Sequence, residues 1–79
     1  MSAPTLAPHT VRAIREAAAA WLAGRRFSGP PVLDHDAIYA VAQAAGVLAS
    51  IYGRPTAWHR AAWFACEREL RAQTEAVRP

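Results

Sequence analysis

The fold is decided by residues 33–55, LDHDAIYAVAQAAGVLASIYGRP, because they contain the clearest helix start in the chain. Asp34 is a favourable N-cap residue, and Asp36 places negative charge in the first turn, where the helix dipole favours it. Leu33 precedes the cap and is spaced to pack on Ile38 as a hydrophobic staple. This pattern predicts a helix that begins at residue 34.

The same stretch predicts where that helix ends. Gly53 is suited to the left-handed conformation that terminates helices, and Pro55 prevents the helix from resuming. We therefore expect a helix over 34–52. Apolar residues at helical spacing on either side predict two more helices, over about 10–23 and about 56–77.

The first of these helices should place its apolar residues on one face: Val11, Ile14, Ala18, Trp21 and Leu22. Either Thr5 or Thr10 could cap its start, because Pro8 is tolerated in a first turn, and we expect the helix to begin at about Thr10. Gly24 is placed to adopt a left-handed conformation after the last turn.

The last helix has Thr56 as its expected cap. Its core-facing stripe is His59, Ala62, Trp63, Cys66, Leu70, Gln73 and Val77. Glu67 and Arg71 are four residues apart in the orientation that favours an ion pair. Cys66 is interpreted as a small buried apolar residue rather than a reactive thiol.

The composition fits one small helical domain. The chain has 79 residues, enough for a single domain over 10–79 after a flexible lead over 1–9. Its single cysteine cannot form an internal disulfide, and no secretion signal precedes the first helix. The longest uncharged stretch, residues 37–53, is too short to span a bilayer. These features predict a soluble, cytoplasmic, all-α three-helix bundle without a transmembrane segment.

The central helix carries more apolar surface than two neighbouring helices can cover. One stripe should face the core: Ile38, Val41, Ala42, Ala45, Leu48, Ala49 and Tyr52. A second stripe of Ala40, Ala44, Val47 and Ile51 lies roughly opposite, and the polar edge consists of Tyr39, Gln43 and Ser50. The N-terminal lead and the connector around Pro30-Pro31 could fold over the second stripe. Alternatively, it is a protein interface, with a homodimer as the simplest case. We expect the interface.

A second candidate surface lies on the last helix, where Phe64 falls among Arg60, Arg68 and Arg71. Arginine stems could simply cover the aromatic ring on a solvated face. The same composition also suits recognition of an acidic protein, a membrane surface or a nucleic-acid backbone. The net charge of +3 permits such a partner without requiring one.

No residue pattern points to catalysis or to a cofactor. His59 and Cys66 are two helical turns, roughly 10 Å, apart, too far for a nucleophile and its base. Paired metal ligands at short spacing are absent from the sequence, so no metal or cofactor is expected. We expect an accessory or regulatory protein–protein interaction module. The alternative is a small basic DNA-binding regulator, in which Gly53-Arg54-Pro55-Thr56 is the turn of a helix-turn-helix.

Overall fold

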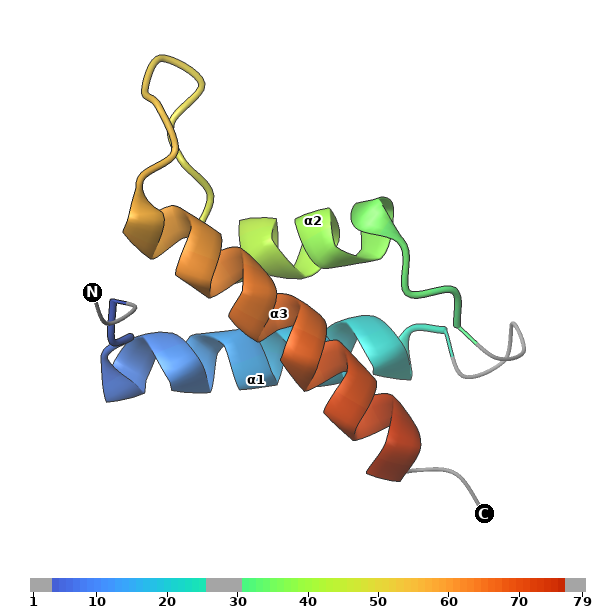
Figure 1. Ribbon diagram of the computed structural model, residues 1–79. Helices are drawn as coiled ribbons and strands as arrows, with labels where there is room; N and C mark the ends of the chain where they lie inside the picture. The colour runs from blue at the N-terminus through green and yellow to red at the C-terminus, as the bar shows by residue number, and fades with distance from the viewer. Residues whose placement is uncertain (1–3, 26–30, 77–79) are drawn as a thin grey trace.

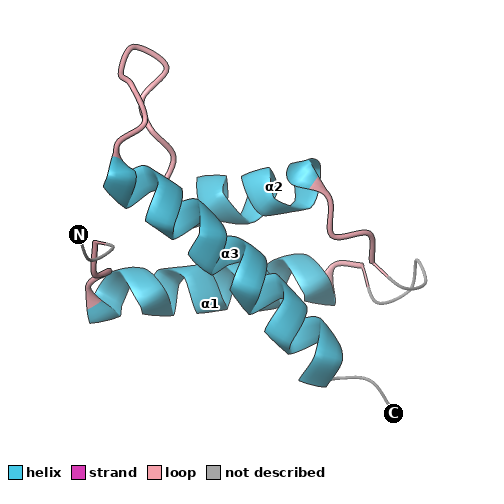
Figure 2. Ribbon diagram, in the orientation of Figure 1, coloured by secondary structure: helices cyan, strands magenta, loops and turns pink. Residues whose placement is uncertain are grey.

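The computed structural model describes residues 4–25 and 31–76, which contain three helices: α1 (Pro8–Ala23), α2 (His35–Ala45) and α3 (Ala57–Ala76). In Figure 1, α2 lies above α1 and runs antiparallel to it, and α3 passes the left end of α2 and crosses in front of α1. Every pair of helices is in contact. The described residues outside the helices form loops and turns (Figure 2). The predicted all-α three-helix bundle is confirmed.

The core is formed by small and medium-sized side chains from all three helices. The most deeply buried residues are Ile14 and Ala18 of α1, Val41 and Ala42 of α2, and Ala62, Cys66 and Leu70 of α3. Alanine and cysteine at these contacts allow the helix axes to approach closely. The partly buried Trp21, Trp58 and Trp63 pack around this cluster. The core stripes predicted for α1 and α3 therefore point inward.

The start of α1 differs from the prediction. The helix begins at Pro8 rather than Thr10, and neither threonine caps it, because the N-cap residue is Ala7, which makes no side-chain hydrogen bond. Thr10 is buried within the first turns. Proline suits a first helical position, since its φ is already helical and the N–H that it lacks would have no partner there. At the other end, Gly24 is right-handed, with φ −69°, so the predicted left-handed residue is also absent.

The start of α2 follows the prediction. The Oδ1 atom of Asp34 accepts a hydrogen bond from the backbone N–H of Ala37 at 3.0 Å, which is the expected N-cap. Asp36 lies in the first turn, and Leu33 packs against the core. The residues around the cap thus fix the position at which the helix begins.

The predicted end of α2 is wrong, because the helix stops at Ala45 and not at residue 52. Gly46 adopts the left-handed conformation, with φ 72°, and its N–H donates to the carbonyl of Gln43. The N–H of Val47 donates to the carbonyl of Ala42 at 3.0 Å. These two bonds form a Schellman motif, which satisfies carbonyls that the helix end leaves free.

This early end removes the helical stripe on which an interface was predicted. Ala40 is half-buried and Ala44 is exposed on α2, but Val47 and Ile51 lie beyond the helix. Val47 turns inward and is 4% exposed, whereas Ile51 is 90% exposed. Tyr52, predicted to face the core, is also exposed. The four residues therefore do not form one apolar face, because the chain leaves the helix between Ala44 and Val47.

The start of α3 has the predicted cap with an unexpected partner. The N–H of His59 donates to Oγ1 of Thr56 at 3.3 Å, and the N–H of Thr56 donates to Nδ1 of His59 at 3.1 Å. This is the reciprocal geometry of a capping box, with histidine in the place usually taken by Glu or Gln. The predicted ion pair of Glu67 and Arg71 is present at 2.8 Å. Val77 lies outside the described residues.

The N-terminal lead was predicted to be a flexible segment over 1–9. Residues 1–3 lie outside the described part of the chain, and Pro8 and His9 belong to α1. Leu6 is partly buried and packs against the core. The part of the lead that the structure describes is thus in contact with the bundle.

Candidate functional site

The loop over residues 46–56 projects from the bundle between α2 and α3 (Figures 1 and 2). At its tip, the N–H of Gly53 donates to the carbonyl of Ser50 at 2.9 Å, closing a turn. The hydroxyl of Ser50 also accepts from the N–H of Tyr52 at 3.2 Å. The turn exposes Ile51 and Tyr52 to 90% and 93%. Two large side chains are therefore held in solvent by a hydrogen-bonded backbone.

A groove of about 570 Å³ lies between this loop and the adjoining sides of α2 and α3. Ala42 and Val47 are buried residues that contribute to its lining, and Tyr39 and Trp63 line it from α2 and α3. Ile51 belongs to the lining as well, so the loop tip and the groove are continuous. We call this groove together with residues 46–56 the loop face.

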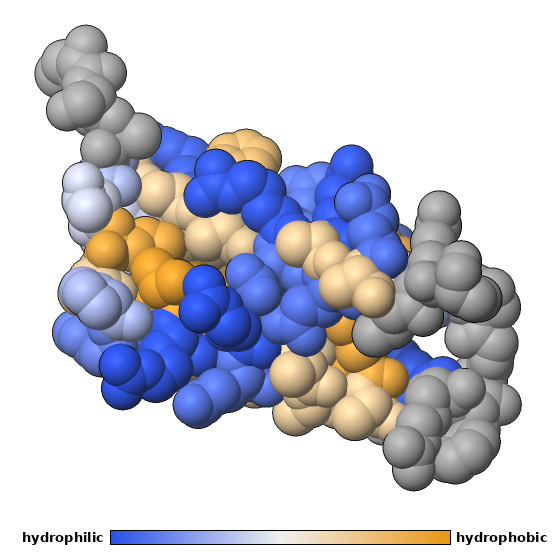
Figure 3. Space-filling view, turned by 90° about the horizontal axis from the view of Figure 1, so that it is seen from below, coloured by the Kyte–Doolittle hydropathy of each residue, from blue (hydrophilic) through white to orange (hydrophobic). Residues whose placement is uncertain are grey.

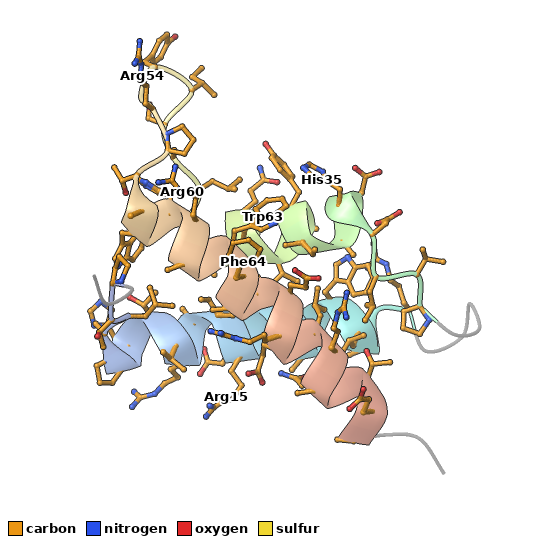
Figure 4. The ribbon with its side chains drawn as sticks, viewed as in Figure 1. Arg15, His35, Arg54, Arg60, Trp63 and Phe64 are labelled. Carbon is orange, nitrogen blue, oxygen red and sulfur yellow. The ribbon has the colours of Figure 1, made fainter. Side chains whose placement is uncertain are left out.

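Aromatic rings connect α2 to α3 along the loop face. The His35 ring lies 4.9 Å from the Trp63 ring at a tilt of 44°, and 6.4 Å from the Tyr39 ring, almost parallel to it. In Figure 4, Arg60, Trp63 and His35 follow one another along the side of the bundle from which the loop rises. The groove therefore presents ring faces beside its aliphatic lining.

The permanent charges of the loop face are those of Arg54 and Arg60. His35, His59 and Arg60 line the groove, and no carboxylate belongs to the described lining. Arg54 lies at the far end of the loop (Figure 4). Among the described residues, neither Arg54 nor Arg60 forms an ion pair, whereas other arginines of α1 and α3 do.

The second predicted surface, on α3, is divided by the structure. Arg60 lines the loop face, whereas Phe64 and Arg68 line a different groove of about 430 Å³ between α1 and α3. Arg71 is paired with Glu67. Phe64 is exposed, but the cation–π contact that the structure shows is that of Arg25 over Trp21, at 3.9 Å. All four residues are exposed on α3, but three of them border two different grooves, and Arg71 is paired.

The side of the molecule away from the loop has a different character. Figure 3, which looks at the bundle from below, shows hydrophilic residues interspersed with several separate apolar patches. The groove beside Phe64 is partly covered by the lead, since Pro4 and Leu6 belong to its lining. The loop face is therefore the stronger candidate for a binding surface.

Sequence reasoning named Val47, Ile51 and Arg60 but missed three aromatic residues of the loop face. Tyr39 was placed on a polar helix edge, Trp63 on the core stripe, and Tyr52 in the core. The signal that could have found them is Gly46 followed by Val47, because an apolar residue after a left-handed glycine packs back on the last turn of a helix. Arg54 follows Gly53 and offers no such contact, so Gly46 was the better candidate for the helix end.

Cys66 and His59, considered above as a nucleophile and its base, both have structural roles in the bundle. Cys66 is fully buried, and burial raises the pKa of its thiol to about 11, so its thiolate is scarce at neutral pH. The Nδ1 atom of His59 lies 2.9 Å from the hydroxyl of Thr56. Residues 4–25 and 31–76 contain no group of three or more His, Cys, Asp or Glu side chains that could hold a metal ion. In the same part of the chain, each helix is too short or too polar to cross a membrane.

The sequence matches no protein-family model, and neither a curated protein nor a solved structure is significantly similar to it. The loop face is therefore the basis on which a function can be proposed.

Proposed function

We propose that this chain is a small protein–protein interaction module, an accessory or regulatory protein that docks a partner protein through the loop face. The observation that carries the proposal is the exposure of Ile51 and Tyr52, at 90% and 93%, on a hydrogen-bonded turn. Neither side chain contributes appreciably to the core. Their placement is explained if they become buried against another molecule.

The energy available from this burial is large enough to matter. Complete burial of an aliphatic side chain is worth about 1.5–3 kcal/mol, and each 1.4 kcal/mol is a tenfold gain in affinity. Tyrosine is also among the residues that most often dominate binding energies at protein interfaces. Ile51 and Tyr52 can therefore supply much of the affinity of a docking contact.

The loop is held in place at both ends, which lowers the entropic cost of binding. Val47 is buried immediately after α2, and Thr56 is hydrogen-bonded to His59 at the start of α3. Between them, Ser50 closes the turn. A segment that is already ordered loses less conformational freedom when it binds.

The DNA-binding alternative loses the feature on which it depended. A helix-turn-helix needs a turn of three or four residues, but residues 46–56 separate α2 from α3. The first turn of α3 also offers few groups to base edges, since Trp58 and His59 are half-buried. We therefore develop the protein-docking proposal alone.

A photo-crosslinking experiment tests the proposal. Benzoylphenylalanine is incorporated in place of Tyr52 and, as a control, in place of Ala19, which is exposed on α1. The chain is expressed in its host and irradiated. We expect a discrete protein adduct from position 52 that position 19 does not give.

The captured protein, identified by mass spectrometry, is then purified and tested for direct binding. Wild-type chain should bind it at least tenfold more tightly than the folded double variant Ile51→Ser, Tyr52→Ser. Capture of a second copy of the chain satisfies the same criterion. Equal adducts at both positions, nucleic acid as the only adduct, or binding unaffected by the double substitution would contradict the proposal.

A further inference from the structure

The loop groove has a composition that restricts what can occupy it. Its aliphatic residues include Val47 and Leu48, and its aromatic walls are Tyr39 and Trp63. Such a lining favours an apolar side chain that enters between rings and aliphatic groups. The groove is open to solvent along the loop, so it suits a segment of chain lying across it rather than an enclosed small molecule.

The charges around the groove restrict the occupant further. Arg60 lines the groove, and Arg54 is exposed on the loop, and neither is paired with a carboxylate of the described chain. His35 and His59 add imidazole rings to the lining, and no described carboxylate belongs to it. The exposed carboxylate of Asp36 lies beside the groove, with its Oδ1 atom 3.9 Å from Nδ1 of His35. Complementary charge on a partner would therefore be negative.

We infer that the occupant of the loop groove is an acidic peptide segment of a partner protein, with an apolar side chain seated between Tyr39 and Trp63 and carboxylates near Arg54 and Arg60. The inference rests on the proposed docking function and names the chemistry of the partner. Arginine can bind a carboxylate through two parallel hydrogen bonds, which fixes the orientation of the segment. The apolar side chain supplies affinity, and the carboxylates supply orientation and a faster encounter.

A second copy of this chain is a poorer occupant on grounds of charge. It would bring Arg54 and Arg60 to a surface that already carries them, and no carboxylate of the described chain lines the groove to pair with them. The chain also has a net charge of +3, so two copies repel each other. An acidic segment removes this repulsion and pairs both arginines.

A nucleic acid is also a poorer occupant. Affinity for a phosphate backbone grows with the number of cations that follow it, and the loop face supplies only Arg54 and Arg60 as permanent charges. Val47, Leu48 and Ile51 leave much of the remaining lining aliphatic. Aliphatic groups gain little from the hydrated backbone of a nucleic acid and more from an apolar side chain.

The test begins with selection from a display library of randomised 12-residue peptides on the immobilised chain. Counter-selection uses Ile51→Ser, Tyr52→Ser, which has the same net charge and so removes peptides that bind through charge alone. We expect the enriched peptides to combine Asp or Glu with a large apolar residue. No enrichment, or enrichment of peptides without net negative charge, overturns the inference.

Synthetic versions of the enriched peptides are then measured by fluorescence anisotropy against charge-matched variants. Arg60→Gln and Arg54→Gln should each weaken binding threefold to tenfold. Arg12→Gln, an equal change of charge at an exposed position on α1, should leave binding within a factor of two. Binding should weaken when salt is raised from 50 to 300 mM. Equal effects at Arg12 and Arg60, or tighter binding of a 15-nucleotide oligothymidylate than of the peptides, overturn the inference.

The outcomes separate this inference from the proposed function. If position 52 crosslinks to a protein that needs Ile51 and Tyr52 but acidic peptides are not selected, docking stands and the acidic partner is wrong. If the crosslinked protein is a second copy and the chain sediments as a dimer, docking also stands and the acidic partner is again wrong. If no crosslink meets the binding criterion, the docking function itself fails.

Discussion

Val47 and Ile51 are both β-branched, apolar and only four residues apart, yet their side chains differ completely in exposure to solvent. Val47 is 4% exposed and belongs to the core, and Ile51 is 90% exposed at the tip of the loop. On a continuous helix they would share one face. The comparison shows that a single left-handed residue, Gly46, decides which apolar residues serve folding and which remain available for binding.

The largest expected effect is that of Val47→Asp. This change buries a carboxylate without a partner, which should cost on the order of 4 kcal/mol, most of the free energy of unfolding of so short a chain. Circular dichroism during urea titration should show a chain that is largely unfolded before denaturant is added.

The matched substitution is Ile51→Asp, which introduces the same residue at the tip of the loop. Because that side chain is solvated in the folded chain, the free energy of unfolding should change by less than about 0.5 kcal/mol. Equal destabilisation by Val47→Asp and Ile51→Asp would show that the loop tip is packed in solution.

The next effect depends on pH and tests the burial of Cys66, which belongs to the same core cluster as Val47. Burial raises the pKa of Cys66 from 9.0 to about 11. Below pH 9 the thiol keeps its proton in both states, so the contribution of this group to stability is complete. Between pH 9 and 11 the unfolded state loses the proton first, and stability falls as pH rises.

This loss should be visible as a falling urea midpoint from pH 9 to 11 in the wild-type chain. Cys66→Ala, although less stable at neutral pH because it leaves a small void, should lack that component of the pH dependence. A native chain that reacts with a disulfide-exchange reagent as fast as the urea-unfolded chain would contradict the burial of Cys66.

Gly46→Ala tests the residue that ends α2 and so causes the difference between Val47 and Ile51. A Cβ atom at this position would meet nothing within 4 Å, so the expected cost, about 1–2 kcal/mol, comes from the left-handed backbone alone. Asparagine tolerates that backbone better, so Gly46→Asn should cost less. Urea titrations of both variants provide the measurement.

Gly53→Ala is the control for this position. The added Cβ would lie 3.7 Å from Ser50, an ordinary contact, and φ at Gly53 is not left-handed, so stability should hardly change. If Gly53→Ala proved as costly as Gly46→Ala, the α2 end at Ala45 would be in doubt.

The smallest of these effects concerns the end of the loop that leads into α3. His59→Ala removes one half of the capping box with Thr56 and should cost about 0.5–1 kcal/mol. His59→Gln should retain most of that stability, because Gln can accept the same hydrogen bond. The double variant Thr56→Ala, His59→Ala should be less destabilised than the two single changes added together, because each single change already removes the contact between Oγ1 of Thr56 and Nδ1 of His59.

The elements that the sequence predicted correctly are those governed by local chemistry. The N-cap of Asp34, the cap of Thr56 and the pair of Glu67 with Arg71 depend on residues within four positions of each other. Burial of Cys66 followed from its position on a helical stripe. Each of these signals can be recognised without knowing the packing of the bundle.

The end of α2 could not be settled in the same way, because Gly46 and Gly53 are both acceptable stops by local chemistry. Choosing between them requires knowing that Val47 can reach the core, where it packs with Val41 and Ala42. That gain is a tertiary contact. The predicted interface depended on the wrong end of α2. Ile51 was therefore correctly predicted to be exposed but was placed on a helix that does not extend to it.

The loop also separates two demands that evolution often places on the same residues. Val47 is buried in the core, and Thr56 precedes the first residue of α3. Between them, the side chains of Ile51, Tyr52 and Arg54 are exposed and do not contribute to the core. Substitutions at these three positions can therefore change which ligand is recognised while leaving the thermal tolerance of the bundle intact. Related chains could diversify their specificity by changing a few codons in this loop.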